Sequence, residues 1–420
     1  MSLVYTAFVP HPPVIVPEIG RGKERVCAQT LAAYQEISAR LVEAEIASVL
    51  VVSPHAPLLK RGVTLLDNGQ VAGDFTQFGA PGVRVSFPAN PGLLAQLAQR
   101  LPAALLRPGL ADHGALVPLY FLQRVGWQGT VVLMGMPLDQ PEKYGKVVGE
   151  VLREASERCA IIASGDLSHR LKDDGPYGFD PAGPLFDEAI IEGLKRNPGT
   201  IAGIPREITE AAGECGLRSL RLALAAQEGF PRVLSYEGPF GVGYLVAELY
   251  VSSPLAHWAR QCLNAYLTEG TANNLPLPQG PEFQVKRGCF VTLKKDGELR
   301  GCIGTTQPWQ ENLALEIQHN AIAAGTEDPR FWPVEPGELP AIRFSVDVLG
   351  DLEKVAGPEE LDPWHYGVVV RGRGRTGLLL PHLEGVNTVA EQVTIAKQKA
   401  GLRTDESVEM WRFEVVRHYE

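Results

Sequence analysis

Residues 4–13 read Val-Tyr-Thr-Ala-Phe-Val-Pro-His-Pro-Pro, an apolar run followed directly by His11. Two more apolar runs are followed by a histidine in the same way: Val-Leu-Val-Val-Ser-Pro precedes His55, and Ile-Ile-Ala-Ser-Gly-Asp-Leu-Ser precedes His169. Short apolar runs of this kind are typical of buried strands. Ligands of an open α/β sheet bind just outside the carboxyl ends of its strands. The three runs therefore predict a sheet with a histidine-lined site at one edge.

Together these histidines favour a metal site. A single histidine at a strand end carries little information, because a polar residue often marks only where the strand meets water. Imidazole is, however, a common ligand of iron, zinc and related metals. Two histidines and one carboxylate leave coordination positions open for a substrate or for oxygen. A divalent metal centre is therefore the first functional hypothesis.

The size and charge of the chain limit the class of function. Its 420 residues exceed the size that one hydrophobic core usually supports, so two domains are expected. A formal net charge of −10 and a pI of about 5.5 argue against a general nucleic-acid-binding surface. A small molecule is therefore the expected substrate.

The cysteines and the amino terminus indicate a cellular compartment. The six cysteines are dispersed, with no C-x-x-C pair and no cluster suited to an iron–sulfur centre. This favours a reducing environment without structural disulfides. The amino terminus lacks a basic segment before its apolar run, and no segment approaches the length of a membrane span. We therefore expect a cytoplasmic protein that does not contact membranes.

The pattern of elements predicts two domains of different class. The first part of the chain alternates strand-like runs with amphipathic helical stretches, which predicts an α/β domain with a central, mostly parallel sheet flanked by helices. Within it, Asn68-Gly69 predicts a β-hairpin across residues 62–71. Later residues read as hairpin strands with separate helices, which predicts an α+β domain. The expected boundaries are 1–251 and 252–420.

The amino-terminal domain resembles the class III extradiol dioxygenase superfamily, the LigB-like fold that also contains the Memo proteins. The resemblance rests on the order and spacing of five short motifs. They are Pro10-His-Pro-Pro, Ser53-Pro-His, Ala111-Asp-His-Gly, Gly165-Asp-Leu-Ser-His and Ser235-Tyr-Glu-Gly-Pro-Phe-Gly-Val-Gly-Tyr. It covers residues 1–251 and implies a LigB-like fold for them.

The resemblance also implies a ligand set. In that superfamily two histidines and a carboxylate hold a divalent metal, usually iron(II), which assigns His11 and His55 as ligands and Glu237 as the third. Zinc(II) is the alternative metal. Two other third ligands stay open. Glu214 lies in a glycine-flanked turn, and Cys215 is a candidate because the Memo branch places a thiol at that position.

His169 and His113 are implied as an acid–base pair beside the metal. Imidazole titrates near neutral pH, so it can take a proton from a bound hydroxyl group and return it later. Asp166 lies three residues before His169 and is expected to orient its ring. The alternatives are structural: Asp166 as the cap of a helix that begins at Leu167, and Asp112-His-Gly as a simple turn.

Residues 252–420 resemble the AMMECR1 domain, whose hallmark is the hexapeptide Leu299-Arg-Gly-Cys-Ile-Gly. Arg300 and Cys302 are candidates for a second site, with the arginine as an anion ligand and the cysteine as a nucleophile. The alternative, which we favour, is structural. In this interpretation the glycines allow a tight strand crossing, the cysteine is buried and the arginine pairs locally.

The two resemblances imply a metal-dependent oxidoreductase, extradiol dioxygenase-like, that acts on a small catecholic substrate and is fused to an AMMECR1 domain. The alternative is a metal-binding accessory or scaffold subunit without dioxygenase activity. Memo-like and AMMECR1-like proteins accompany a radical S-adenosylmethionine (radical SAM) enzyme in many prokaryotes, so such an enzyme is the expected partner. The chain has no C-x-x-x-C-x-x-C cluster of its own. Related proteins also make a homodimer the expected assembly.

Overall fold

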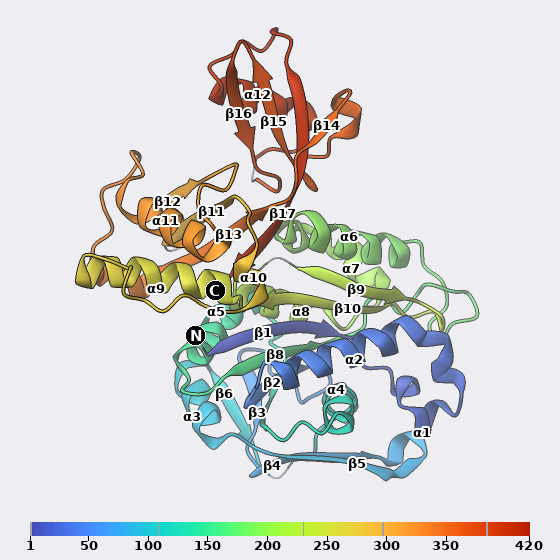
Figure 1. Ribbon diagram of the computed structural model, residues 1–420. Helices are drawn as coiled ribbons and strands as arrows, with labels where there is room; N and C mark the ends of the chain where they lie inside the picture. Colours follow the sequence, from blue (N-terminus) through green and yellow to red (C-terminus); the bar gives the residue numbers. More distant parts are fainter. Residues whose placement is uncertain (1, 108, 230, 296–297, 384) are drawn as a thin grey trace. The chain divides into compact units, whose positions relative to one another are not determined.

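The structure is a computed structural model that describes residues 2–107, 109–229, 231–295, 298–383 and 385–420. The chain divides into two compact units, Met1–Val251 and Ser252–Glu420 (Figure 1). Each unit has its own hydrophobic core. Within the described ranges, no helix is long and apolar enough to cross a membrane.

An eight-stranded mixed sheet forms the centre of the first unit (Figure 1). Its strands are β1 (Leu3–Val9), β2 (Ser48–Ser53), β3 (Val63–Leu66), β6 (Ala103–Leu106), β7 (Thr130–Gly135), β8 (Cys159–Ser164), β9 (Arg232–Glu237) and β10 (Tyr244–Val251). Their order is β6-β3-β7-β2-β8-β1-β10-β9, and the inner strands β7, β2, β8 and β1 run parallel. Antiparallel pairing adds β10 and β9 at one flank. The predicted α/β class is confirmed, and the carboxyl ends of β1, β2 and β8 lie at one edge.

Helices cover both faces of this sheet. They are α1 (Pro17–Gly20), α2 (Ala28–Glu43), α3 (Pro91–Arg100), α4 (His113–Arg124), α5 (Pro141–Glu154), α6 (Ala182–Arg196), α7 (Arg206–Ala212) and α8 (Leu217–Ala226). Residues of α2 and α4 share one core cluster with Tyr5 and Val49 of the sheet. On the other face α8 packs against β1 and β8, and α5 packs against α8. A Cβ at Gly149 of α5 would overlap the carbonyl oxygen of Ala226, so this close approach requires glycine.

The inner strands owe their continuous apolar sequence to burial on both faces. Every residue of β2 and every residue of β8 is buried. Parallel strands covered by helices on both sides carry runs rich in Val, Ile and Leu rather than an alternating pattern. The polar residues that follow these strands therefore mark the first position where a side chain can serve a site.

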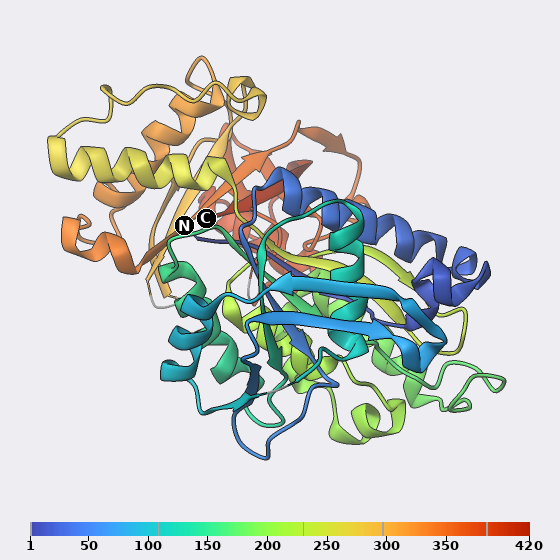
Figure 2. The same cartoon turned by 90° about the horizontal axis from the view of Figure 1, so that it is seen from below.

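The β-hairpin predicted around Asn68-Gly69 does not form. β3 pairs with β6 and β7, whereas β4 (Gln70–Phe75) pairs with β5 (Ala80–Pro88) in a separate two-stranded sheet, seen as two light-blue arrows in Figure 2. Gly69 does adopt the positive φ of a turn, 66°. The turn at Gly69 was therefore predicted correctly. The partner of each strand, however, is determined by tertiary packing and not by this turn.

A seven-stranded antiparallel sheet forms the second unit (Figure 1). The strands are β11 (Cys289–Lys295), β12 (Glu298–Gly304), β13 (Ile342–Leu349), β14 (Glu353–Val355), β15 (Tyr366–Gly372), β16 (Arg375–Leu379) and β17 (Glu409–Tyr419), and the helices are α9 (Pro254–Glu269), α10 (Pro281–Gln284), α11 (Leu313–Thr326) and α12 (Val389–Lys399). The order is β12-β11-β13-β17-β15-β16, with β14 beside β17. α9 and α11 pack on β11 to β13, and α12 packs on β15 and β16. The predicted α+β class is confirmed.

Candidate metal centre

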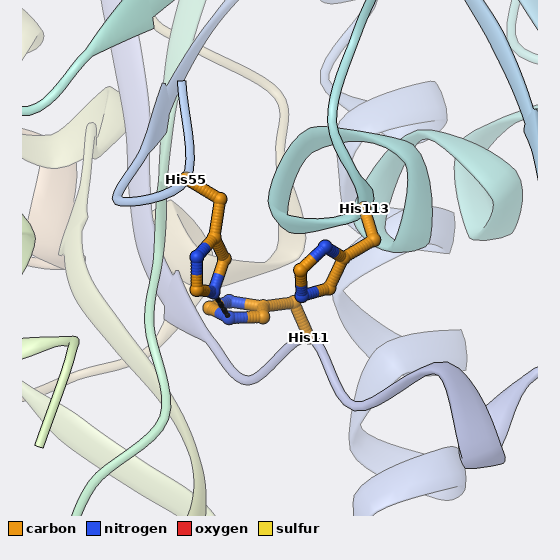
Figure 3. Close-up of side chains that lie close together, drawn as sticks. All are labelled: His11, His55 and His113. Atoms are coloured by element: carbon orange, nitrogen blue, oxygen red, sulfur yellow. Dashed lines mark hydrogen bonds between the residues drawn. The ribbon is translucent and has the colours of Figure 1, made fainter. Parts of the chain in front are cut away.

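Three histidines converge at the carboxyl edge of the first unit's sheet (Figure 3). His11 follows β1, His55 follows β2, and His113 is the first residue of α4. The Nε2 atoms of His11 and His55 lie 2.9 Å apart, and the rings of His55 and His113 stack with centroids 4.3 Å apart. One ring nitrogen from each histidine lies within 4.8 Å of the others. Because imidazole nitrogens bind metals at about 2 Å, this spacing suits ligands of a single ion.

Hydrogen bonds determine which nitrogen of His11 is free to bind. Ser164, at the end of β8, donates its hydroxyl proton to the carbonyl oxygen of Gly114 at 2.5 Å. The serine oxygen is then the acceptor for Nδ1–H of His11, 2.9 Å away. A neutral imidazole carries one proton, so Nε2 of His11 keeps its lone pair and faces His55. Metal-binding histidines typically donate their second N–H in this way.

A capped helix start delivers His113. Asp112 is the N-cap of α4, and its Oδ1 accepts the backbone N–H of Gly114 at 2.8 Å. The same oxygen accepts the hydroxyl proton of Ser53, at the end of β2, at 2.6 Å. The Asp112-His-Gly segment is thus a helix start tied to the strand that precedes His55. His113, which the sequence placed in an acid–base pair, lies in the candidate ligand set.

Burial keeps these imidazoles neutral. It lowers the pKa of His113 to about 4, and the neighbouring His55 adds to the effect. The pKa of His11 lies well below its ordinary value, because the ring is buried and faces His55 and His113. Neutral imidazoles offer lone pairs at physiological pH. The cluster is therefore suited to a metal cation rather than to protons.

A second set of candidate ligands shares His11. Sγ of Cys215 lies 3.7 Å from Nε2 of His11, and Oδ1 of Asp166 accepts the backbone N–H of His11 at 2.9 Å. Cys215 lies in the turn between α7 and α8. Burial raises the pKa of its thiol, and a bound cation favours the thiolate. Because His11 has one free nitrogen, the two sets describe one centre and not two.

Two known protein families match this chain. Residues 5–247, more than half of the chain, match the family described as the catalytic LigB subunit of aromatic ring-opening dioxygenase. Residues 256–418 match the AMMECR1 family. The chain belongs to the LigB family. Its second unit is an AMMECR1 domain, so the fusion predicted from the sequence is confirmed.

Individual relatives and solved structures match parts or all of this chain. Protein CA_C1420 of Clostridium acetobutylicum is 38% identical over 468 aligned residues, which cover 100% of both chains. A protein of Thermotoga maritima is 51% identical over 169 residues, which cover 39% of this chain and 97% of that protein. The crystal structure of JW3007 from Escherichia coli K12 is 15% identical with a TM-score of 0.43, and covers 59% of this chain and 99% of that one. The crystal structure of PH0010 from Pyrococcus horikoshii is 30% identical with a TM-score of 0.37, and covers 39% of this chain and 88% of that one.

The LigB domain holds His169 near this centre, on the loop that follows β8. Its ring stacks on Tyr177 with centroids 5.1 Å apart. Burial lowers the pKa of His169 to about 4, and His55 lies within electrostatic range of it. Nε2 of His169 is buried and has no hydrogen-bond partner among the described residues. A buried polar atom left unpaired costs stability, which makes this nitrogen a candidate contact for a ligand.

Asp166 contacts a different histidine from the one predicted. Its carboxylate accepts the backbone N–H of His11, and no described hydrogen bond joins it to His169. No helix begins at Leu167 either, because residues 165–168 form an irregular loop. The loop is held by Gly243, which accepts the N–H of Leu167 and donates its own N–H to the carbonyl of Ser168. The position of Asp166 therefore supports the His11 backbone and not the His169 ring.

Glu237 caps a helix instead of joining either ligand set. It is the last residue of β9, and its Oε2 accepts both the N–H and the hydroxyl proton of Thr30, each at 2.7 Å. Thr30 lies in the first turn of α2, where free N–H groups and the helix dipole stabilise a carboxylate. Glu214 has a similar role at α8, where it accepts the N–H of Leu217 at 2.6 Å. Among the described residues, neither acid belongs to a metal-binding set.

In the AMMECR1 domain, Arg300 and Cys302 have separate surroundings. Arg300 forms an ion pair with Glu338 at 2.9 Å and donates to the carbonyl oxygen of Trp332 at 2.9 Å. The sulfur of Cys302 accepts a hydrogen bond from the hydroxyl of Thr292. Burial raises the pKa of the Cys302 thiol, which makes it a weak nucleophile at neutral pH. The local pairing of Arg300 matches the structural alternative.

A buried acid, Asp187 of α6, holds the loop that carries His169. Its Oδ1 accepts the backbone N–H of Ser168 at 2.7 Å, and its Oδ2 accepts the hydroxyl proton of Tyr236 at 2.6 Å. Only 1% of Asp187 is exposed. Burial raises its pKa from 3.8 to about 7. The loop is therefore anchored by a carboxyl group that titrates near neutral pH.

The substitution Asp187→Asn should change how the stability of the LigB domain depends on pH. Between pH 3.8 and about 7, the folded state binds more protons at Asp187 than the unfolded state does. The free energy of unfolding therefore falls as the pH rises through this window, by roughly 1.4 kcal/mol per pH unit. In denaturant unfolding, the wild type should lose about 2 kcal/mol more than the variant between pH ~5 and pH ~7. Equal losses in both proteins would contradict a raised pKa at Asp187.

Proposed function

We propose that the LigB domain is a metal-dependent, dioxygenase-like enzyme that acts on a small phenolic substrate. The observation that carries the proposal is the set of imidazoles of His11, His55 and His113, brought within reach of one ion and supported by Ser164. The match to the LigB family supports the reaction class. Iron(II) is the metal we propose, because nitrogen ligands with open positions suit non-haem iron, and zinc(II) is the alternative.

The side chains around the site provide the proton chemistry. A bound divalent metal acts as a Lewis acid and lowers the pKa of a hydroxyl group bound to it. His169 accepts the proton of such a hydroxyl at its unpaired Nε2, because its imidazole is neutral at physiological pH. Tyr177 packs on the imidazole and keeps its orientation. The same nitrogen returns the proton to the product.

Two substitutions test whether Cys215, and not Glu237, binds the metal beside His11. Cys215→Ala should weaken metal binding by about 100-fold or more. Losing a group that only supports a ligand costs at most about 100-fold, so a larger loss identifies Cys215 as a ligand. Glu237→Gln should leave metal affinity unchanged and lower stability by about 1 kcal/mol, because Glu237 caps α2. Chelator competition and denaturant unfolding measure the two quantities. Loss of the metal in Glu237→Gln, with retention in Cys215→Ala, would reverse the assignment.

The enzyme proposal is tested by metal loading followed by a substrate screen. The protein is purified anaerobically, its metal content is measured by mass spectrometry, and it is reconstituted with iron(II). A panel of catechols is then added with oxygen, and oxygen consumption is followed together with the absorbance of ring-opened product. Oxygen consumption that requires both iron and a catechol supports the proposal. Failure to bind any metal refutes it.

One observation favours a second function, that of a metal-binding accessory subunit. The thiol of Cys215 lies at Nε2 of His11, and the Memo branch is expected to have a thiol as third ligand. In that case the same experiment gives one metal per chain but no oxygen consumption with any catechol. We propose a radical SAM enzyme as the partner for this function. Co-purification with that enzyme, lost in His11→Ala, is its test, and light scattering tests the proposed homodimer.

A further inference from the structure

His55 and His113, whose rings stack in Figure 3, share one hydrogen-bonded support. The hydroxyl of Ser53, the last residue of β2, accepts the backbone N–H of His55 at 3.2 Å and donates its proton to Oδ1 of Asp112 at 2.6 Å. The same carboxylate oxygen accepts the backbone N–H of Gly114, the residue after His113, at 2.8 Å. Ser53 and Asp112 therefore form a clamp between the loop after β2 and the start of α4, the two segments that supply these histidines.

This clamp is closely packed against the start of α4. A Cβ added at Gly114 would lie 2.5 Å from the hydroxyl oxygen of Ser53 and 2.9 Å from Oδ1 of Asp112. It would also lie 3.3 Å from Cδ2 of the His55 ring. Ser53 is fully buried, and a buried hydroxyl group that loses its partner costs stability. The position of His55 relative to α4 is therefore fixed by direct contacts and not by one flexible side chain.

Asp112 also brings a negative charge next to ligands that carry none. Burial lowers the pKa of His55 and of His113, so both imidazoles are neutral, and the Asp112 carboxylate opposes that effect at each of them. Glu237, the carboxylate expected among the ligands, caps α2 instead. A second acid near the cluster, Asp166, bonds to the backbone of the remaining histidine. Among these three acids, Asp112 is the one whose charge acts on both neighbouring imidazoles.

We propose that Asp112 is a positioning residue of the metal centre and that its carboxylate offsets the charge of the bound ion from outside the ligand set. The inference rests on the proposed function and deepens it, because it assigns a group that sets the redox potential of the iron. A negative charge near a metal ion stabilises the more highly charged state of that ion. The Asp112 carboxylate therefore favours iron(III) over iron(II) and lowers the reduction potential of the pair. Ser53 contributes by holding this carboxylate and the backbone of His55 in one arrangement.

The substitution Asp112→Asn tests this inference in the full-length protein. Asparagine is as good an N-cap as aspartate, and it keeps an oxygen for Ser53 and Gly114, so the variant removes the charge alone. In the iron-loaded protein the reduction potential should rise by about 59 mV, which corresponds to an about tenfold weaker preference for iron(III) over iron(II). Affinity for zinc(II) should fall by about 10- to 100-fold. An anaerobic titration with redox dyes measures the potential, and chelator competition measures the affinity.

Two further variants separate the effect of position from that of charge. Ser53→Ala breaks the clamp and keeps the carboxylate, so zinc affinity should fall by about tenfold while the potential rises less than in Asp112→Asn. Glu157→Gln is the matched control. Glu157 accepts the hydroxyl proton of Ser48 at the other end of β2, about 16 Å from Ser53 along the strand. This control should equal the wild type in both measurements.

The possible failures are distinguishable. A wild-type protein that binds neither iron nor zinc refutes the proposed function, and the role of Asp112 falls with it. A wild type that binds metal, beside an Asp112→Asn variant with unchanged potential and affinity, overturns the role of Asp112 alone. If circular dichroism shows that Asp112→Asn is unfolded, Ser53→Ala decides, because unchanged zinc affinity in that variant overturns the clamp.

Discussion

The variant His11→Ala should contain no metal under conditions in which the wild-type protein holds one ion per chain. His11 belongs to both candidate ligand sets, so its loss removes a ligand whether His113 or Cys215 completes the site. We expect metal affinity to fall by at least about 1,000-fold, beyond the 10- to 100-fold cost of changing a group that only supports a ligand. Mass spectrometry and competition with a chromophoric chelator measure the loss.

Two further variants make this result specific. His319→Ala is the matched control, because His319 is an exposed histidine of the AMMECR1 domain, and it should bind metal as the wild type does. Ser164→Ala removes the acceptor for Nδ1–H of His11 but keeps the ligand itself, so affinity should fall by about 10- to 100-fold. A full metal content in His11→Ala would refute the centre.

The strand-end histidines were predictable because each follows its strand closely. In the sheet, β1 and β2 are separated only by β8, and the three strands run parallel. Residues just beyond them therefore meet at one edge. The structure brings His11 and His55 together there, with their Nε2 atoms 2.9 Å apart. The local sequence shows where each strand ends, whereas the parallel pairing of β1 and β2 with β8 comes from the sheet.

Long-range packing decides the remaining ligands. His113 begins α4, and its place is set by the packing of that helix against β2 and β8, not by the residues around His113. Glu237 ends β9 and Cys215 lies in the turn before α8, and each is followed by a glycine, so their sequences do not rank them. Glu237 accepts hydrogen bonds from Thr30, a residue 207 positions away in the chain. The residues next to Glu237 in the sequence therefore do not predict that Thr30 is its partner.

The AMMECR1 hexapeptide shows the same limit. Residues 299–304 identified the domain, because the motif is specific to that family. The partner of Arg300 is Glu338, 38 positions away in the chain, and the cation that contacts Cys302 is Arg330, 28 positions away. A motif can therefore reveal which family a segment belongs to without revealing which of its residues are free to bind a ligand.

Replacing His169 by glutamine should slow turnover strongly and leave the metal in place. The buried Nε2 of His169 has no hydrogen-bond partner in the described part of the chain, and we assign it the proton of the substrate hydroxyl. Glutamine keeps a polar side chain that forms hydrogen bonds but does not titrate near neutral pH. We expect kcat to fall by about 10²- to 10⁴-fold, the usual contribution of a general acid–base group, with metal content unchanged. Oxygen consumption with the best catechol of the screen measures the rate.

The comparison with Tyr177→Leu separates proton transfer from packing. That variant removes the ring stacked on His169 but keeps the imidazole, so its rate should fall much less than that of His169→Gln. If His169→Gln turned over almost as fast as the wild type, the proton would have to leave through another group. If it lost its metal instead, His169 would be a ligand. In either case the unpaired nitrogen of His169 would need a different partner from the one proposed, because a buried polar atom is costly to leave unpaired.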